Sequence, residues 1–227
     1  FACRSLSSCK LFKIRFIRLF IPLIFGIYVV VAPQLYFELI ANEGASLSFM
    51  EFYQLYINTD TLEFKAYHHG PIALLTWNHL WYLAYLFTYT LAFIAIKPLL
   101  DCLAGSKLLQ HPAPSLILLV PTLLIGTINY HLYDIYPQTN ALFGDWFNHA
   151  LYFSVLVMGY LMGNNLPIWS SIVRLRKVFL VIAGATYALV LANHHGMLNS
   201  LADWPAASLL LAYVSALHTC VWILMLL

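Results

Sequence analysis

Charged side chains are scarce in this sequence of 227 residues, and their scarcity argues against a soluble fold. Asp, Glu, Lys and Arg together make up 9% of the chain, whereas soluble domains average about 25%. Hydrophobic residues make up 62%, and the mean hydropathy is +0.80. The basic residues are confined to short segments, so we expect no nucleic-acid partner. The composition predicts an integral membrane protein that has lipid as its immediate partner.

Cysteine is also sparse, with four residues in the whole chain. Cys3, Cys9 and Cys102 fall in polar segments that are predicted to lie on the same side of the membrane, and Cys220 falls inside an apolar run. None is placed to form an oxidised pair, so we expect no structural disulfide. We also expect neither a metal site nor a bound cofactor.

Long apolar runs are the dominant feature of what is present. Each is about long enough to cross ~30 Å of hydrocarbon at ~1.5 Å per residue. The runs cover residues 16–33, 77–96, 112–130, 147–163, 178–193 and 206–227. Lipid leaves only helices or closed barrels, and continuous apolar runs of this length predict helices. We therefore expect one all-α polytopic membrane domain over 1–227 with about six transmembrane helices.

The longest stretch predicted to lie outside the membrane is the loop 34–76. The apolar spacing of residues 47–53 within it predicts a short amphipathic helix at the outer interface.

The basic residues are distributed unequally between the two sets of connections. When the apolar runs are threaded through the membrane in turn, ten of the eleven Lys and Arg residues, from Arg4 to Lys177, lie on the same side. Lys65 is the exception. Positive charge stays on the cytoplasmic side, so the segments that carry these ten residues are predicted to be cytoplasmic, in the inner membrane of a bacterium. The same threading places seven of the nine histidines at or above the outer interface; they are His68, His69, His79, His131, His149, His194 and His195.

Three local patterns combine polar and aromatic residues at predicted outer helix ends. They are Pro33-Gln-Leu-Tyr-Phe-Glu38, Trp77-Asn-His-Leu-Trp-Tyr-Leu-Ala-Tyr85 and Gly144-Asp-Trp-Phe-Asn-His-Ala-Leu-Tyr152. Asp145 and His149 are four residues apart, so a helix would bring them together. A carboxylate beside an imidazole raises its basicity and orients it for acid–base work. Asp145 could equally cap the helix, and one residue can do both.

Taken in order, these three patterns resemble the membrane-bound acyltransferase 3 family, in its glucan biosynthesis protein C type. The segment from Arg15 to Gly26 also resembles the third helix of that family. The resemblance covers residues 13–227. It implies an O-acyltransferase that takes an acyl group from acyl-CoA, as co-substrate, and delivers it to a hydroxyl of an extracytoplasmic glycan or similar acceptor.

Within that resemblance, particular residues are expected to carry the chemistry. The expected catalytic residues are His79, Asp145 and His149, and those expected to bind the acceptor are Tyr36, Glu38, Asn78, Trp81, Tyr82 and Asn148. A His would remove the hydroxyl proton while nearby donors orient the acceptor or the developing oxyanion. Arg174, Arg176 and Lys177 could attract the phosphates of the donor. Membrane topology alone also accounts for these three cations.

The sequence departs from the family at both ends. The Arg and His of the family's first helices have no counterpart, and the chain begins without Met and stops within an apolar run. We therefore expect an internal fragment, inactive alone, whose main catalytic His lies upstream.

Two other classes compete with the acyltransferase. A transporter or flippase of a polar solute would use Pro22, Pro121 and nearby glycines to break helices around a midplane site, but spans three to five carry no deep acidic residue. A haem or quinone protein with two histidine ligands would need facing histidines at matched depth, and His218, alone in its run, has no obvious partner.

Overall fold

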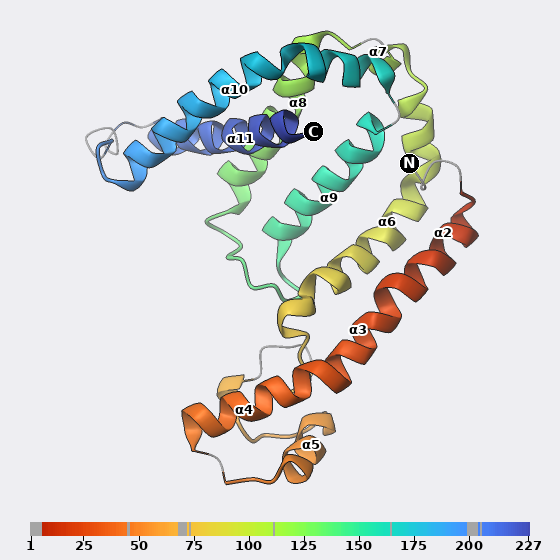
Figure 1. Cartoon of the computed structure of the whole chain (residues 1–227), viewed down its shortest axis with the longest axis vertical. Helices are drawn as coiled ribbons and strands as arrows, with labels where there is room; N and C mark the ends of the chain where they lie inside the picture. The colour runs from red at the N-terminus through yellow and green to blue at the C-terminus, as the bar shows by residue number, and fades with distance from the viewer. Residues whose placement is uncertain are drawn as a thin grey trace. The chain divides into compact units, whose positions relative to one another are not determined.

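A computed structural model describes residues 6–44, 46–67, 72, 74–110, 112–163, 165–198, 204 and 206–227 (Figure 1). Cys3, Arg4, His68 and His69, which carried predictions, lie outside the described residues. Within this described part, five helices are long and apolar enough to cross a membrane; they cover Ser8–Glu43, Asn78–Ala104, Pro114–Leu132, Leu166–His194 and Ala207–Leu226. The described part contains no β-strand, only an isolated bridge between Ile72 and Leu75. The prediction of an all-α, multi-pass integral membrane protein is confirmed.

The chain divides into two compact units, which are described separately here. The N-terminal unit contains the described residues of Ser5–Ile96 together with Thr139–Asp145. The C-terminal unit contains the described residues of Lys97–Gln138 and Trp146–Leu227. All hydrogen bonds discussed below lie within one unit.

The N-terminal unit begins with one uninterrupted helical rod of 36 residues. It consists of α2 (Ser8–Arg15), η1 (Phe16–Phe20), α3 (Ile21–Phe25), η2 (Gly26–Val31) and α4 (Ala32–Glu43), of which η1 and η2 are π-helical. The rod ends at Gly44, whose positive φ of 62° suits glycine at a helix C-terminus. The helix that was predicted to end at Pro33 continues to Glu43. That the chain leaves the membrane near residue 34 stays a prediction.

The π-helical turns explain why proline does not end the rod. Pro22 follows η1 and Pro33 follows η2, and each proline lies in the first turn of the next α-helical segment. Proline has no N–H, so an α-helix that runs through it loses a hydrogen bond and suffers a clash. A local π-turn changes the pairing before the proline, and membrane helices tolerate proline through such adjustments. Proline in this sequence therefore marks a change of helix type.

The short helix expected after residue 47 is present as α5 (Phe49–Ile57). Ser48 and Glu51 form a capping box at its start, with the Ser48 N–H donating to Glu51 Oε2 at 2.8 Å. The aromatic face of α5 buries Phe52 and Tyr56 against Leu35 and Leu39 of α4. The prediction of a short helix here is confirmed.

Two tyrosine hydroxyls of α5 donate to carbonyl oxygens of η2. Tyr56 donates to Ile27 at 2.9 Å, and Tyr53 donates to Tyr28 at 3.3 Å. In a π-helix the carbonyl of Tyr28 would accept from the N–H of residue 33, which is proline and has none. The Tyr53 hydroxyl donates to this carbonyl, to which Pro33 cannot donate.

The second predicted span, 77–96, begins in η4 (Asn78–Leu80) and continues as α6 (Trp81–Ala104). The helix extends beyond residue 96 because the first charges past that point neutralise each other. Lys97 Nζ lies 2.7 Å from Asp101 Oδ2, one helical turn away, and Tyr160 of α9 (Trp146–Met162) also donates to Asp101.

The third and fourth predicted spans differ in length. The third, 112–130, is α8 (Pro114–Leu132), which continues through Pro121. The fourth, 147–163, is α9, whose 17 residues span about 25 Å at 1.5 Å per residue. That length falls short of the ~30 Å hydrocarbon core. Within the described residues, five long helices therefore stand where six spans were predicted.

The fifth predicted span, 178–193, is part of the much longer helix α10 (Leu166–His194). Its 29 residues correspond to about 44 Å, more than the hydrocarbon core requires. Arg174, Arg176 and Lys177 were predicted to lie in a connection, but they lie inside α10 and are exposed on its surface. The helix continues through them because Arg and Lys are good helix formers and no glycine or proline separates them from the apolar run.

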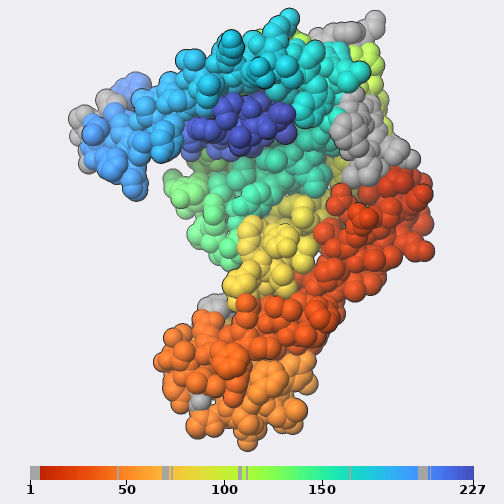
Figure 2. Space-filling view, viewed as in Figure 1, coloured from red at the N-terminus to blue at the C-terminus, as the bar shows by residue number. Residues whose placement is uncertain are grey.

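The last helix, α11 (Ala207–Leu226), agrees closely with the predicted span 206–227. It packs against α8 and α10, and the space-filling view shows it beside α10 (Figure 2). Gly126 of α8 permits the close approach, because a Cβ at this position would lie 2.4 Å from the ring of Tyr213. The Tyr213 hydroxyl lies 2.9 Å from Thr127 Oγ1, which links the two helices beside that contact.

Candidate functional site

His79, the predicted catalytic base, lies in η4 with its imidazole exposed. Its Nε2 is 3.3 Å from Nε2 of Gln34 on α4. An amide N–H can donate only to a deprotonated ring nitrogen, so this hydrogen bond favours the tautomer in which Nε2 is the acceptor. The Nε2 lone pair can act as a general base only after an acceptor hydroxyl replaces the Gln34 amide as its hydrogen-bond partner.

The neighbours of His79 form a short polar and aromatic edge. Asn78 has a positive φ of 41°, and its backbone N–H donates to Thr76 Oγ1 at 3.3 Å. Trp81 packs edge-to-face on Tyr85 with ring centroids 5.3 Å apart. Tyr82 is 47% exposed. Asn78 and Tyr82 are therefore accessible beside His79, whereas Trp81 is half-buried and supports the helix.

Asp145 is buried, and its carboxylate is held from two directions. Its Oδ2 accepts from the hydroxyl of Tyr85 at 2.7 Å and from the backbone N–H of Asn140 at 3.0 Å. The same hydroxyl lies 2.9 Å from the carbonyl of Ala141, and Trp77 Nε1 donates to the carbonyl of Asn140 at 3.0 Å. The segment 139–145 is thereby fastened to the start of α6. Asp145 positions this segment, and the predicted catalytic role stays a prediction.

The other two predicted residues of the third motif belong to the C-terminal unit. Asn148 and His149 lie in the first turn of α9, Asn148 buried and His149 half-buried. The ring of His149 meets that of Trp146 edge-to-face, with centroids 6.0 Å apart. Asp145 lies immediately before α9, and its predicted pairing with His149 stays a prediction.

Tyr36 and Glu38, predicted at the entrance, both lie on α4. The Tyr36 hydroxyl donates to the carbonyl of Leu47 at 3.0 Å, and its ring contacts those of Phe49 and Phe52. Tyr36 therefore anchors α5 and the preceding segment to α4. Glu38 is exposed on the surface of α4.

Burial and hydrogen bonding shift two pKa values beside this region. Burial raises the pKa of Tyr56 to about 12. Hydrogen bonds from the side chain and the backbone of Ser48 lower the pKa of Glu51. The Tyr56 shift reflects the burial of α5 against the rest of the unit, and the Glu51 shift reflects the capping box at the start of that helix.

Sequence reasoning missed Gln34 and Tyr85 as site residues, although both lie inside quoted motifs. The signal was available for Tyr85, because a phenol on a strongly apolar helix needs a polar partner when it is buried. For Gln34 no local signal existed, since its partner is 45 residues away.

The described residues contain no group of three or more His, Cys, Asp and Glu side chains that could hold a metal ion. His218, for which no partner was foreseen, lies with its Nδ1 3.1 Å from Thr186 Oγ1 of α10. Its ring also stacks on Tyr187, with centroids 6.1 Å apart.

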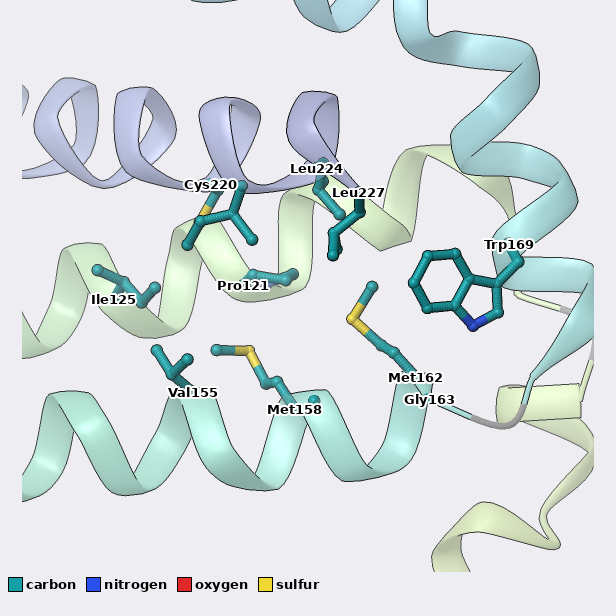
Figure 3. A pocket seen from close by; sticks show the side chains of 12 residues that line it. Pro121, Ile125, Val155, Met158, Met162, Gly163, Trp169, Cys220, Leu224 and Leu227 are labelled. Atoms are coloured by element: carbon teal, nitrogen blue, oxygen red, sulfur yellow. The ribbon is translucent and has the colours of Figure 1, made fainter. Parts of the chain in front are cut away.

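An apolar pocket of about 200 Å³ lies in the C-terminal unit among α8, α9, α10 and α11 (Figure 3). Met158 and Met162 of α9 face Pro121 of α8 and Leu224 of α11 across it, with Trp169 at one end. Met is flexible and adapts to irregular space. This lining can accept apolar groups only.

The comparisons with known proteins return no match. No family model matches the sequence, no curated protein matches it, and no solved structure matches the fold. The functional conclusion therefore depends on the residues and their geometry.

Proposed function

We propose that this chain carries the acceptor side of a membrane O-acyltransferase, which moves an acyl group from acyl-CoA to a hydroxyl of an extracytoplasmic glycan. One observation supports this above the others: in the N-terminal unit, the first motif contacts the second, and the second contacts Asp145 at the start of the third. Gln34 of the first motif bonds His79 of the second, and Tyr85 of the second bonds Asp145 of the third.

The proposed chemistry begins at His79. The acceptor hydroxyl displaces the Gln34 amide from His79 Nε2, and this nitrogen takes the hydroxyl proton as the oxygen attacks the thioester carbonyl of the donor. The C–S bond then breaks, and the CoA thiolate leaves and takes up a proton. Gln34 orients the imidazole, while Asn78 and Tyr82 offer donors to the acceptor or to the developing oxyanion.

Acyl-CoA would bind to cationic side chains on the cytoplasmic side of a bacterial inner membrane. Arg174, Arg176 and Lys177 are exposed within four residues of one another on α10. Charge-assisted hydrogen bonds from Arg to phosphate are short and strong, so this segment suits the donor's phosphates. Beyond these cations, the remaining apolar part of α10 is long enough for most of a membrane crossing.

A transporter is the less well supported alternative. It needs helices broken near the midplane, whose freed backbone groups bind the solute. In this structure α8 continues through Pro121, and α9 continues through Gly159. These two helices therefore lack the interruptions that the transporter interpretation requires.

The test uses membranes that contain the protein carrying this sequence, with acyl-CoA labelled in the acyl group. Label should appear in the extracytoplasmic glycan, and His79→Ala should lower the transfer by about 100-fold or more, the usual contribution of a general base. His194→Ala, at the exposed end of α10, is the matched control and should transfer normally. Equal transfer by both variants would remove His79 from the mechanism. Solute uptake without acyl transfer would overturn the proposed function.

A further inference from the structure

A second recess, half polar and half apolar, lies in the C-terminal unit among α8, α9 and α11. Its volume is about 740 Å³. Polar groups reach it from both sides, with Asn129 and Tyr133 at the end of α8, Asp134 just beyond, and Ser208, Ser215 and Thr219 along α11. Ile125, Phe147 and Leu151 supply much of the apolar lining.

The antiparallel packing of α8 and α11 determines the depth of this cleft. Asn129 Nδ2 donates to the carbonyl of Ala212 at 3.5 Å, and Thr127 Oγ1 lies 2.9 Å from the hydroxyl of Tyr213. Ser208 lies in the first turn of α11, and the distance along the helix to Thr219 is about 16 Å at 1.5 Å per residue. The cleft therefore follows about half the ~30 Å thickness of the hydrocarbon core.

Polar side chains at such depth are costly unless something satisfies them. The Thr219 hydroxyl donates to the carbonyl of Ser215 at 3.0 Å, which uses its one hydrogen and leaves its lone pairs as acceptors. Ser208 and Ser215 are exposed on α11 and face the cleft with hydroxyls that can both donate and accept. In hydrocarbon these groups require water or a polar ligand.

The charges of the residues that line the cleft limit the chemical class of ligand that it can bind. None of the described residues that line the cleft is Lys, Arg or His, and one, Asp134, carries a carboxylate. A phosphate-bearing headgroup would find no cation and would be repelled by Asp134. Hydroxyl, amide and carboxylate groups instead match the mixed donors and acceptors of a sugar. The ring of Tyr133 packs edge-to-face on Phe147 at 5.3 Å, which forms an aromatic wall for the apolar face of such a ring.

We propose that this cleft binds the uncharged, polyhydroxylated headgroup of an amphiphile, such as a neutral glycolipid. The apolar part of the lining, at Ile125 and Leu151, would contact the first segment of the attached chain. The ligand would enter from the bilayer, since α8 and α11 are both long enough to cross it. This inference concerns the C-terminal unit alone and does not depend on the proposed acyl transfer.

The experiment uses the purified protein in nanodiscs and an alkyl glucoside that carries a diazirine on the sugar. After irradiation, peptides are mapped by mass spectrometry. We expect labelling on α8 and α11 at residues that line the cleft, and competition by excess octyl glucoside. A phosphocholine and a trimethylammonium amphiphile of the same chain length should not compete at equal concentration.

Two variants of the cleft test whether the labelling depends on its hydroxyl groups or only on non-specific contact with the amphiphile. Ser215→Ala and Thr219→Val remove one hydroxyl each with little change in volume, and each should lower the competable labelling at least fivefold. Ser170→Ala, at an exposed serine of α10, should leave it unchanged, and all three variants should melt within a few degrees of the parent. Equal competition by all three amphiphiles, selective competition by the ammonium amphiphile, or unaltered labelling in both cleft variants would overturn the proposal.

Discussion

The hydroxyl of Tyr85 donates to Asp145 Oδ2 at 2.7 Å, across 60 residues of sequence, and both side chains are buried. A hydrogen bond to a carboxylate is shorter and stronger than one between neutral groups. Here it joins α6 to the segment 139–145, which leads directly into α9. The second motif of the family resemblance is therefore held to Asp145, at the start of the third motif, by a side-chain hydrogen bond.

Removal of that contact should destabilise the protein. Tyr85→Phe leaves the buried Asp145 with one fewer donor, and the loss of a hydrogen bond to a buried charged group costs about 1.5–3 kcal/mol. We expect a lower melting temperature in detergent, measured by differential scanning fluorimetry. Tyr187→Phe, which keeps the ring of an exposed tyrosine on α10, is the control and should melt as the parent does. Equal melting of both variants would show that the contact contributes no stability.

A double-mutant cycle should reveal that Tyr53 compensates for Pro33. Tyr53→Phe removes the donor to the carbonyl of Tyr28, and we expect a cost of about 0.5–1.5 kcal/mol in the free energy of unfolding. Pro33→Ala restores an N–H to the rod, so the same change should cost much less in that background. Chemical unfolding of the four proteins gives the coupling energy. A coupling of zero would mean that the tyrosine and the proline act independently.

Alkaline stability should depend on Tyr56. Its pKa is raised to about 12 by burial, whereas a tyrosine in the unfolded chain ionises near 10. The unfolded state therefore loses its proton first, and stability present below pH 10 decreases as the pH rises from 10 through 12. The loss should be about 3 kcal/mol at most, because the shift is about two pKa units and each unit corresponds to ~1.4 kcal/mol. Unfolding measured across this range should be less steep in pH for Tyr56→Phe, and identical profiles would contradict the prediction.

Acid should weaken the start of α5 through Glu51. The hydrogen bonds from Ser48 lower the pKa of Glu51, so their contribution is present above the ordinary carboxyl pKa and is lost as the pH decreases through the lowered value. The protection factors of the α5 amides, which are corrected for the intrinsic pH dependence of hydrogen exchange, should decrease at acid pH in the parent. In Ser48→Ala the same amides should already exchange faster at neutral pH. Unchanged exchange in that variant would show that the capping box does not hold the helix.

Gly126 and Gly159 form a matched pair on neighbouring helices. An alanine at residue 126 would place its Cβ 2.4 Å from the Tyr213 ring, whereas the same change at residue 159 meets nothing within 4 Å. Overpacking of this kind costs about 1–3 kcal/mol. We expect Gly126→Ala to lower the melting temperature and Gly159→Ala to raise it slightly, since alanine favours the helix. Equal melting temperatures of the two variants would show that α8 and α11 are not in close contact at Gly126.

The helix α10 shows how far the sequence could predict this protein and where that prediction ended. Apolar runs identified the location of every long helix, because lipid requires runs of that length whatever their neighbours are. The boundaries were less accurate: Arg174, Arg176 and Lys177 marked a predicted connection, yet a helix that extends past the hydrocarbon core can carry its charges without interruption. Proline ordinarily ends a helix because it has no N–H, which is why the sequence predicts a helix end at Pro33. In the structure a π-helical turn precedes Pro33, and the hydroxyl of the distant Tyr53 donates to a carbonyl of that turn.

What the sequence by itself determined is the helical, multi-pass membrane character, since hydropathy and backbone satisfaction act locally along the chain. The tertiary structure alone decided which polar groups meet. The contacts of Gln34 with His79 and of Tyr85 with Asp145 depend on packing between segments that no local pattern relates. The same holds for the cleft between α8 and α11, because a recess exists only once both helices are in place.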